Sequence, residues 1–151
     1  MLRTRIADAL KTAMKSKDAK STATLRLIMA ALKDRDIAAR SKGNKDGILE
    51  DEVLGMLQSM IKQRRESISL YEKGGRMELA QQEAEEIAVI EEFLPEQMSE
   101  DDMTAAIDTV IGETEAASLK DMGRVMAALK DRHAGSMDFS KASALVKSRL
   151  S

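Results

Sequence analysis

The sequence lacks cysteine and tryptophan, and its 151 residues include one histidine, His133, and one proline, Pro95. Without cysteine there can be no disulfide, no thiolate nucleophile and no zinc or iron–sulfur site held by cysteine. A single histidine excludes a site with several histidine ligands and a Ser-His-Asp triad within one chain. His133 precedes Ala134 and Gly135 at a predicted helix end, which is typical of a helix C-terminus. We therefore expect neither a metal nor another cofactor.

Long hydrophobic runs are also missing. No apolar run approaches the roughly 20 residues that span a bilayer. The N-terminal residues 1–5 lead into an amphipathic pattern, without the apolar core of a signal peptide. We expect no membrane segment and a cytoplasmic location.

Aromatic residues make up only 2% of the chain. A β-sandwich or barrel needs many turns and many aromatic or β-branched residues, so this composition disfavours both. Alanine, leucine, methionine, lysine and glutamate are abundant, and all of them favour helices. The sequence therefore predicts an all-α fold.

Apolar residues spaced three and four apart predict seven helices. Their ends are set by turn residues, by Pro95, and by serines and aspartates that can cap a helix. The predicted apolar stripes include Met14, Ile37 and Leu119, which we expect to face inward. The approximate ranges are 2–15, 18–40, 50–73, 76–94, 99–111, 119–132 and 138–150.

The break from Pro95 to Ser99 predicts a domain boundary. We expect an N-terminal helical domain of about four helices at 1–95. A three-helix module is expected at 96–151.

Charge is unevenly distributed, although the formal net charge is only −2. Residues 1–65 carry 15 Lys and Arg against 8 Asp and Glu, residues 66–115 carry 2 against 15, and residues 116–151 carry 7 against 3. Such blocks can neutralise one another between packed helices, or the basic blocks can meet an external polyanion. We expect the C-terminal module to be cationic.

Two charged segments are predicted to lie side by side if the chain turns back at its Gly-Gly pair, residues 74–75. Positions whose numbers add to about 149 are then level, which places Arg65 near Glu83, and Lys62 near Glu86. Paired carboxylates held by cations can act as an acid/base site. Helical hairpins also carry such pairs to fix their register. We favour this second interpretation, an interhelix ion-pair ladder.

Basic residues in the C-terminal module are candidates for contacts with nucleic acid. A rotation of about 100° per residue places Lys120 and Arg124 together on the polar side of their helix, with Gly123 between them and the apolar stripe. Lysine and arginine neutralise phosphates of any sequence, and glycine allows a close backbone approach. With few aromatics to stack on bases, such contacts should read phosphate and shape; a solvated basic face is the alternative. The RNA-binding candidates are Lys120, Gly123, Arg124, Lys130, Lys141 and Lys147.

Several separated motifs resemble the GatB/YqeY family and occur in that family's order. They are LRLIMAALKDRDI (25–37), IKQRRES (61–67), YEKGGRMELAQQEAEEI (71–87), FLPEQMSEDDM (93–103), DMGRVMAALK (121–130) and SALVKSRL (143–150). Their length and order are similar to those of free-standing YqeY-like members. The resemblance implies an N-terminal domain of about four helices and a C-terminal three-helix module similar to the tail domain of GatB.

The resemblance also implies a function. GatB is a subunit of the glutamine-dependent amidotransferase that converts misacylated Glu-tRNA or Asp-tRNA, and its tail helps to hold the tRNA. The family therefore implies carbon–nitrogen ligase activity with glutamine as amido-N-donor. We expect this chain alone to be non-catalytic, because it has no nucleotide loop or metal-ligand set.

The resemblance implies that this chain shares the basic surface of the GatB tail. The matching residues are Lys120, Gly123, Arg124 and Lys147. Where relatives often have a turn rich in glycine and basic residues, this chain has HAGSMDFSK (133–141).

Three hypotheses follow, in our order of preference. The first is a tRNA-associated accessory protein that binds through its C-terminal module. The second is a protein-interaction scaffold without RNA binding, for which the acidic middle segment and the 11 methionines are suited. Its partners would belong to translation or tRNA aminoacylation. The third is an enzyme that takes part in amide transfer only with partner subunits.

Overall fold

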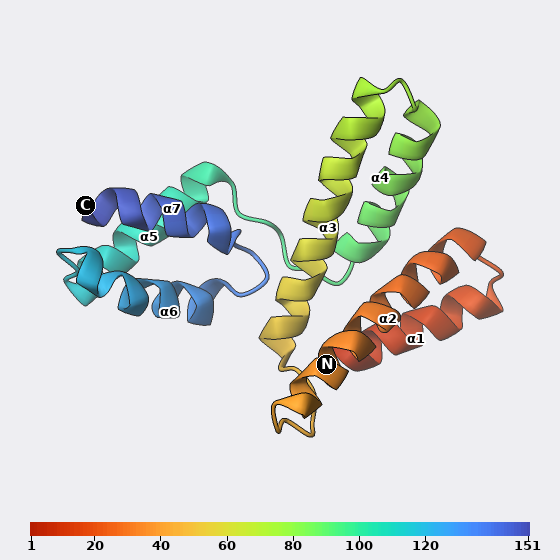
Figure 1. Ribbon diagram of the computed structural model, residues 1–151, viewed down its shortest axis with the longest axis horizontal. Helices are drawn as coiled ribbons and strands as arrows, with labels where there is room; N and C mark the ends of the chain where they lie inside the picture. Colours follow the sequence, from red (N-terminus) through yellow and green to blue (C-terminus); the bar gives the residue numbers. More distant parts are fainter. The chain divides into compact units, whose positions relative to one another are not determined.

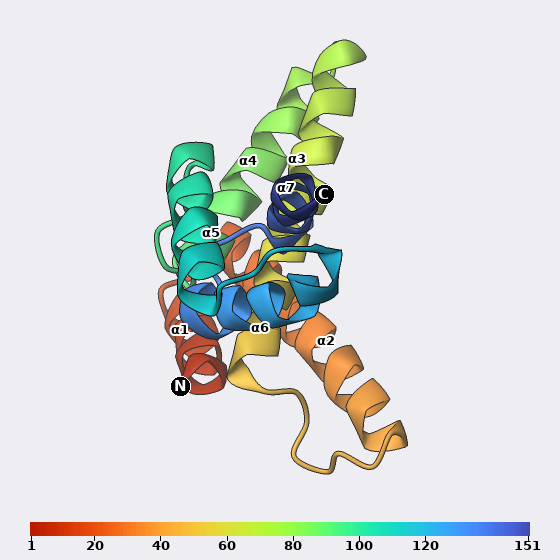
Figure 2. The ribbon, with the colours of Figure 1, turned by 90° about the vertical axis from the view of Figure 1, so that its left-hand side faces the viewer.

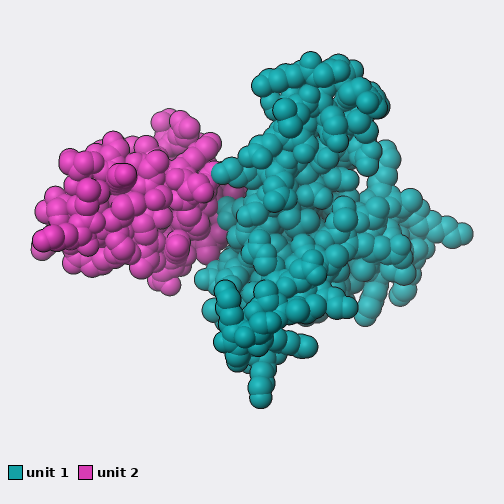
Figure 3. All heavy atoms as spheres, viewed as in Figure 1, with its two compact units in different colours: residues 1–94 teal, residues 95–151 magenta.

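The computed structural model describes residues 1–151 and contains seven α-helices, one 3-10 turn and no β-strand (Figure 1). The prediction of an all-α chain is thereby confirmed. The chain divides into two compact units, residues 1–94 and residues 95–151 (Figure 3). The elements are α1 (Leu2–Lys15), α2 (Ala19–Ser41), α3 (Glu50–Lys73), α4 (Met77–Glu91), α5 (Glu100–Thr114), η1 (Leu119–Asp121), α6 (Met122–His133) and α7 (Phe139–Leu150).

The first unit consists of two helical hairpins. Helix α1 packs along α2, and α3 packs along α4, and α2 also contacts both helices of the second hairpin (Figures 1 and 2). Each helix contributes a fully buried apolar side chain to one core, namely Ile6, Ile28, Leu57 and Ile90. Burial of this apolar surface is the main stabilising contribution to the hairpin pairing.

A polar clip fixes the start of α3 against α1 and α2. Arg3 donates to both carboxylate oxygens of Asp36, at 2.6 and 2.7 Å, and to the Ile48 carbonyl at 2.8 Å. Asp36 also accepts from the Ile48 amide at 2.9 Å. The Arg3 hydrogen bond, aided by the Ile48 amide, lowers the pKa of Asp36 to about 2. Gly47 is required beside the clip, because its φ is +85° and a Cβ there would collide with the Asp36 carboxylate.

Helix α4 ends three residues earlier than predicted, at Glu91 and not at Leu94. The Phe93 amide donates to the Ile90 carbonyl, and the Leu94 amide to the Glu91 carbonyl, which is the tighter bonding of a final turn. Pro95 moves the preceding residue away from helical angles. The last predicted turn is therefore not α-helical.

The second unit packs α5, α6 and α7 around a core of its own, which includes Ile107, Leu129 and Val146. Ser99 is one of the serines that cap a helix, and it forms a capping box at the start of α5. Its hydroxyl accepts from the Asp102 amide at 3.1 Å, and the Asp102 carboxylate accepts from the Ser99 amide at 3.3 Å.

Three apolar side chains that were predicted to face inward are instead half exposed: Met14 at 50%, Ile37 at 51% and Leu119 at 47%. A four-residue step advances about 40° around a helix, so three such steps from Leu2 take Met14 off the buried stripe. Ile37 lies nine residues after Ile28, on the opposite side of α2. Leu119 belongs to the 3-10 turn, to which α-helical spacing does not apply.

Candidate nucleic-acid interface

The six RNA-binding candidates lie on three elements of the second unit that contact one another, and all six are exposed. Lys120 is on η1. Helix α6 carries Gly123, Arg124 and Lys130, and helix α7 carries Lys141 and Lys147.

The arginines of this unit differ from its lysines in their partners. Arg124 pairs with Asp121 at 2.9 Å, Arg132 with Glu113 at 2.5 Å, and Arg149 with Asp108 at 2.9 Å. None of the four lysines forms an ion pair with a carboxylate of the chain. The lysines are therefore the cations of this unit that have no carboxylate partner.

Asp121 links Arg124 to the hydrogen bonds that form the N-terminal end of α6. Its carboxylate accepts from the amides of Ala117 and Ser118, at 2.9 and 3.2 Å, as well as from Arg124. The two backbone hydrogen bonds, with Arg124 adding to them, lower the pKa of Asp121. Lys120 and Arg124 are both exposed, but Arg124 shares its charge with Asp121 and Lys120 does not.

Gly123 lies on open surface. A Cβ built at this position would meet no other atom within 4 Å. Lys130 follows seven residues later and so lies on nearly the same side of α6, about 20° away. A residue without a side chain and an unpaired cation thus lie on the same side of α6, almost two turns apart.

The predicted cationic module is only partly cationic. The basic segment from residue 116 packs with the acidic helix α5, and the compact unit 95–151 holds 7 Lys and Arg against 10 Asp and Glu. The prediction counted charge from residue 116 and missed α5. The unit therefore has two kinds of charged surface, with lysines on η1, α6 and α7 and carboxylates on α5.

The charged residues of the α3–α4 hairpin come together, but one position away from the predicted pairing. Arg64 Nε lies 2.9 Å from Glu86 Oε2 and 3.9 Å from Glu83 Oε2. Arg65 instead reaches Glu91 at 3.5 Å, and Lys62 is exposed and forms no ion pair. One residue rotates a helical position by about 100°, which turns Arg65 away from the carboxylates.

A signal in the sequence could have identified Arg64. It lies four residues after Met60 and four before Ile68, so it continues the apolar stripe that faces α4. Its side chain is only 14% exposed. Arg64 is therefore the central cation of the ladder.

The two carboxylates that Arg64 holds are not equivalent. Burial and then the neighbouring Glu86 raise the pKa of Glu83, and Arg64 opposes this only in part. A carboxyl with a raised pKa is a feature of acid/base sites, and also of ion-pair clusters between helices. The groove that includes Glu86 is lined by α2 and α4 residues such as Ala23, Thr24 and Val89. The Thr24 hydroxyl donates to the Lys20 carbonyl at 3.2 Å, so it is engaged within its own helix.

Two other kinds of site are not found. No three His, Asp or Glu side chains come together in a way that could hold a metal ion. No helix combines the length and the apolar character needed to cross a membrane.

Comparison with known families decides which family this fold and motif order represent. The profile of the "Yqey-like protein" family matches residues 3–150. The chain belongs to this family. The match includes both units, so the YqeY-like assignment applies to the N-terminal hairpins as well as to the lysine-bearing unit.

Three curated proteins are similar to this YqeY-like chain over part of its length. "Altered inheritance of mitochondria protein 41, mitochondrial" of Eremothecium gossypii is 34% identical over 85 residues, which are 56% of this chain and 44% of that protein. The Kluyveromyces lactis protein of the same name is 31% identical over 84 residues, 56% of this chain and 43% of that protein. "Uncharacterized protein C22F3.15" of Schizosaccharomyces pombe is 30% identical over 86 residues, 57% and 66% of the two chains. The aligned regions thus span less than half of the first two relatives.

Proposed function

We propose that this YqeY-like chain is an accessory protein that docks on the phosphate backbone of tRNA through lysines of its C-terminal unit. The observation that carries the proposal is the contrast between the cations of that unit: the arginines are held by carboxylates, whereas the lysines are exposed without ion pairs. An unpaired, solvated lysine can neutralise a phosphate and release its counterion.

The proposal takes one lysine from each of the three elements in mutual contact, namely Lys120 on η1, Lys130 on α6 and Lys147 on α7. Lys141 is six residues from Lys147 and thus about 120° away around α7, so it would contribute from a flank. Phosphate contacts of this kind fix position and orientation without reading sequence. Recognition would then depend on the shape of the folded RNA.

No catalytic step is proposed for the chain alone. The carbon–nitrogen ligase activity implied by the family resemblance would belong to partner subunits, and the part of this chain would be to hold the tRNA. A cytoplasmic location remains a prediction from the sequence.

A tRNA titration at several salt concentrations, followed by fluorescence anisotropy, tests the proposal. Affinity should fall steeply with salt, and the triple variant Lys120→Gln, Lys130→Gln, Lys147→Gln should bind weakly, with its salt slope reduced by about one for each phosphate that is no longer neutralised. The matched control removes three exposed, unpaired lysines of the first unit: Lys42→Gln, Lys45→Gln, Lys73→Gln. Equal weakening in both triple variants, or no binding at low salt, would contradict the proposal.

A second variant tests whether RNA approaches the α6 backbone closely, without changing any charge. Gly123→Ala changes no charge, has open space for its methyl group and favours the helix. If RNA approaches the α6 backbone at this point, the variant should bind tRNA more weakly while its thermal stability stays the same or rises. Unchanged binding would remove Gly123 from the interface.

A scaffold without RNA binding is the second candidate, because the unit as a whole holds more carboxylates than cations. It predicts no salt-dependent affinity for tRNA. The same titration therefore decides between the two functions.

A further inference from the structure

Helix α2 has a second face, beside its buried one, that combines cations with apolar side chains. Arg26, Lys33 and Arg40 recur every seven residues, which is nearly two helical turns, so they stay on one side of the helix for roughly 21 Å. Apolar residues lie between them on the same side. We call this face the α2 stripe; its residues are Arg26, Met29, Ala30, Lys33, Ile37 and Arg40.

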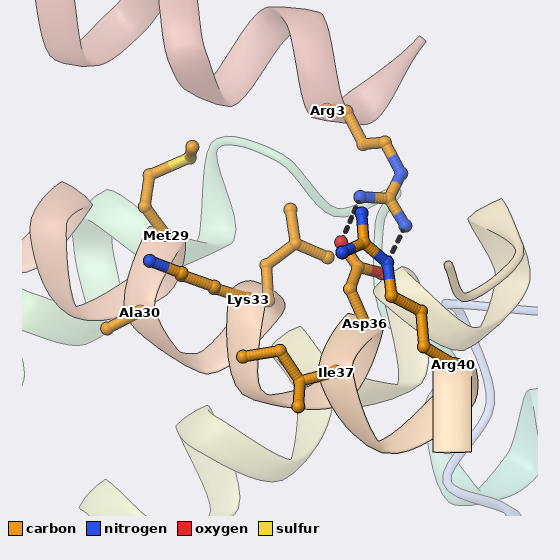
Figure 4. A pocket seen from close by; sticks show the side chains of 8 residues that line it. Arg3, Met29, Ala30, Lys33, Asp36, Ile37 and Arg40 are labelled. Carbon is orange, nitrogen blue, oxygen red and sulfur yellow. Dashed lines mark hydrogen bonds and ion pairs between the residues drawn. The ribbon is translucent and has the colours of Figure 1, made fainter. Parts of the chain in front are cut away.

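Most of the α2 stripe borders a cavity of about 480 Å³, into which Arg3 reaches from α1 (Figure 4). Its one carboxylate, Asp36, accepts hydrogen bonds from both terminal guanidinium nitrogens of Arg3. Lys33 and Arg40 form no ion pair, and Ile37 is 51% exposed. The cavity thus has unpaired positive charge beside exposed apolar surface. A complementary partner carries negative charge next to apolar or small side chains.

The length of the stripe favours a helix as that partner. A small anion would occupy one end and leave the other cations unmatched. A helix with acidic residues at the same seven-residue interval can follow all three cations, as the charged flanks of coiled coils do.

Helix α5 carries a pattern of this kind. Asp101, Asp108 and, at the C-cap, Glu115 are spaced seven residues apart, and the small residues Ala105 and Gly112 lie between them on the exposed side. A Cβ at Gly112 would meet nothing within 4 Å, so another helix could approach closely there. We call these five residues the α5 stripe. Only its middle carboxylate has a partner, in the exposed ion pair with Arg149.

Helix α4 has acids at the same interval but is less available. Glu78 pairs with Arg76 at 2.8 Å, and Glu85 with Lys20 at 3.0 Å. The α5 stripe therefore matches the cations of α2 better.

We propose that the α5 stripe of one copy of this chain docks along the α2 stripe of a second copy. The acids of α5 would meet Arg26, Lys33 and Arg40, and the small residues of α5 would let Ile37 pack against its backbone. Association of this kind is strengthened by opposite charge, and salt weakens it. It uses α5 and not the lysines proposed for tRNA, so the two interactions can be tested separately.

Analytical ultracentrifugation of the full chain without RNA tests the proposal. The mass should rise above that of one chain with concentration at low salt and return to one chain at high salt. Lys33→Glu with Arg40→Glu, and separately Asp101→Lys with Asp108→Lys, should each weaken self-association at least about tenfold, because like charges then face each other. An equimolar mixture of these two variants should associate again. Circular dichroism establishes that each variant is folded.

The matched control is Lys42→Glu with Lys45→Glu, which makes the same charge change in the exposed loop after α2. A further variant, Ile37→Ser, removes apolar surface without changing charge and should also weaken association. A chain that is monomeric at all concentrations at low salt would overturn the proposal. So would an equal effect of the loop control, or failure of the two reversed variants to associate with each other.

Discussion

The α3–α4 hairpin and the C-terminal unit use their cations in opposite ways. In the hairpin, Arg64 is 14% exposed and holds two carboxylates across the helix interface. In the C-terminal unit, Lys120 and Lys130 are exposed and hold none. A charge taken out of water needs a partner, whereas a solvated charge does not. A buried cation thus contributes to the stability of the fold, whereas an exposed cation without a partner is available to bind an anion.

Replacing Arg64 should have the largest effect on stability. Arg64→Leu leaves Glu83 and Glu86 largely out of water without their cation, and we expect a loss of about 2 kcal/mol. Urea unfolding followed by the fluorescence of Tyr71, the only tyrosine, reports on this unit. The control Arg65→Leu removes a cation that is 63% exposed and should cost less than about 0.5 kcal/mol. Equal losses would contradict the distinction between buried and exposed cations.

The Arg3–Asp36 clip should be the next most sensitive feature. Asp36→Asn weakens two charged hydrogen bonds and should cost about 1 kcal/mol at pH 7. Because the folded pKa of Asp36 is lowered to about 2, its contribution is complete above the ordinary value of 3.8 and is lost as pH falls through 2. Acid unfolding of wild type and variant should therefore converge below that pH. Asp34→Asn, an exposed neighbour, is the control, and a similar cost there would refute the role of the clip.

A smaller effect of opposite sign is expected at Glu83. Its folded pKa is raised, so its favourable contribution is present below the ordinary value of 4.5 and is lost as pH rises through the folded pKa. Glu83→Gln keeps the neutral form at pH 7 and should be neutral or stabilising by a few tenths of a kcal/mol, a difference that shrinks toward pH 4. Glu86→Gln removes the 2.9 Å partner of Arg64 and should destabilise instead. Chemical unfolding at pH 7 and pH 4 measures both, and matching signs would contradict this assignment.

The smallest effect on stability is expected where binding is proposed. Lys120→Gln with Lys130→Gln should change the unfolding free energy by no more than about 0.5 kcal/mol, because neither side chain has a partner to lose. Thermal unfolding by circular dichroism checks this. A larger change would show that these lysines serve the fold, as Arg64 does.

Much of the helical architecture could be predicted because its signals are local. The apolar spacing and the Ser99–Asp102 capping box act within one or two turns, and α1 and α3 have the predicted ranges. The prediction that the chain turns back at residues 74–75 correctly placed the charged residues of α3 and α4 at the same height in the hairpin. Knowing which positions are level does not show which way each side chain points, however. A rotation by one residue makes Arg64, and not Arg65, face the carboxylates of α4.

The candidate interface was less predictable for a different reason. Charge counted along the sequence does not show which cations are neutralised, and Asp108, Glu113 and Asp121 each take an arginine of the C-terminal unit. Two of these three carboxylates lie on α5, which was not part of the segment over which the basic charge was counted. Tertiary packing therefore decides which cations have no carboxylate partner, and in this unit these are the lysines.

The central claim is tested most directly by amide chemical-shift mapping of the full, isotopically labelled chain titrated with tRNA. If tRNA docks on the C-terminal lysines, perturbations concentrate at 119–130 and around Lys147, change little in the α3–α4 hairpin and disappear at high salt. Perturbations concentrated in the first unit, or none at low salt, would contradict it.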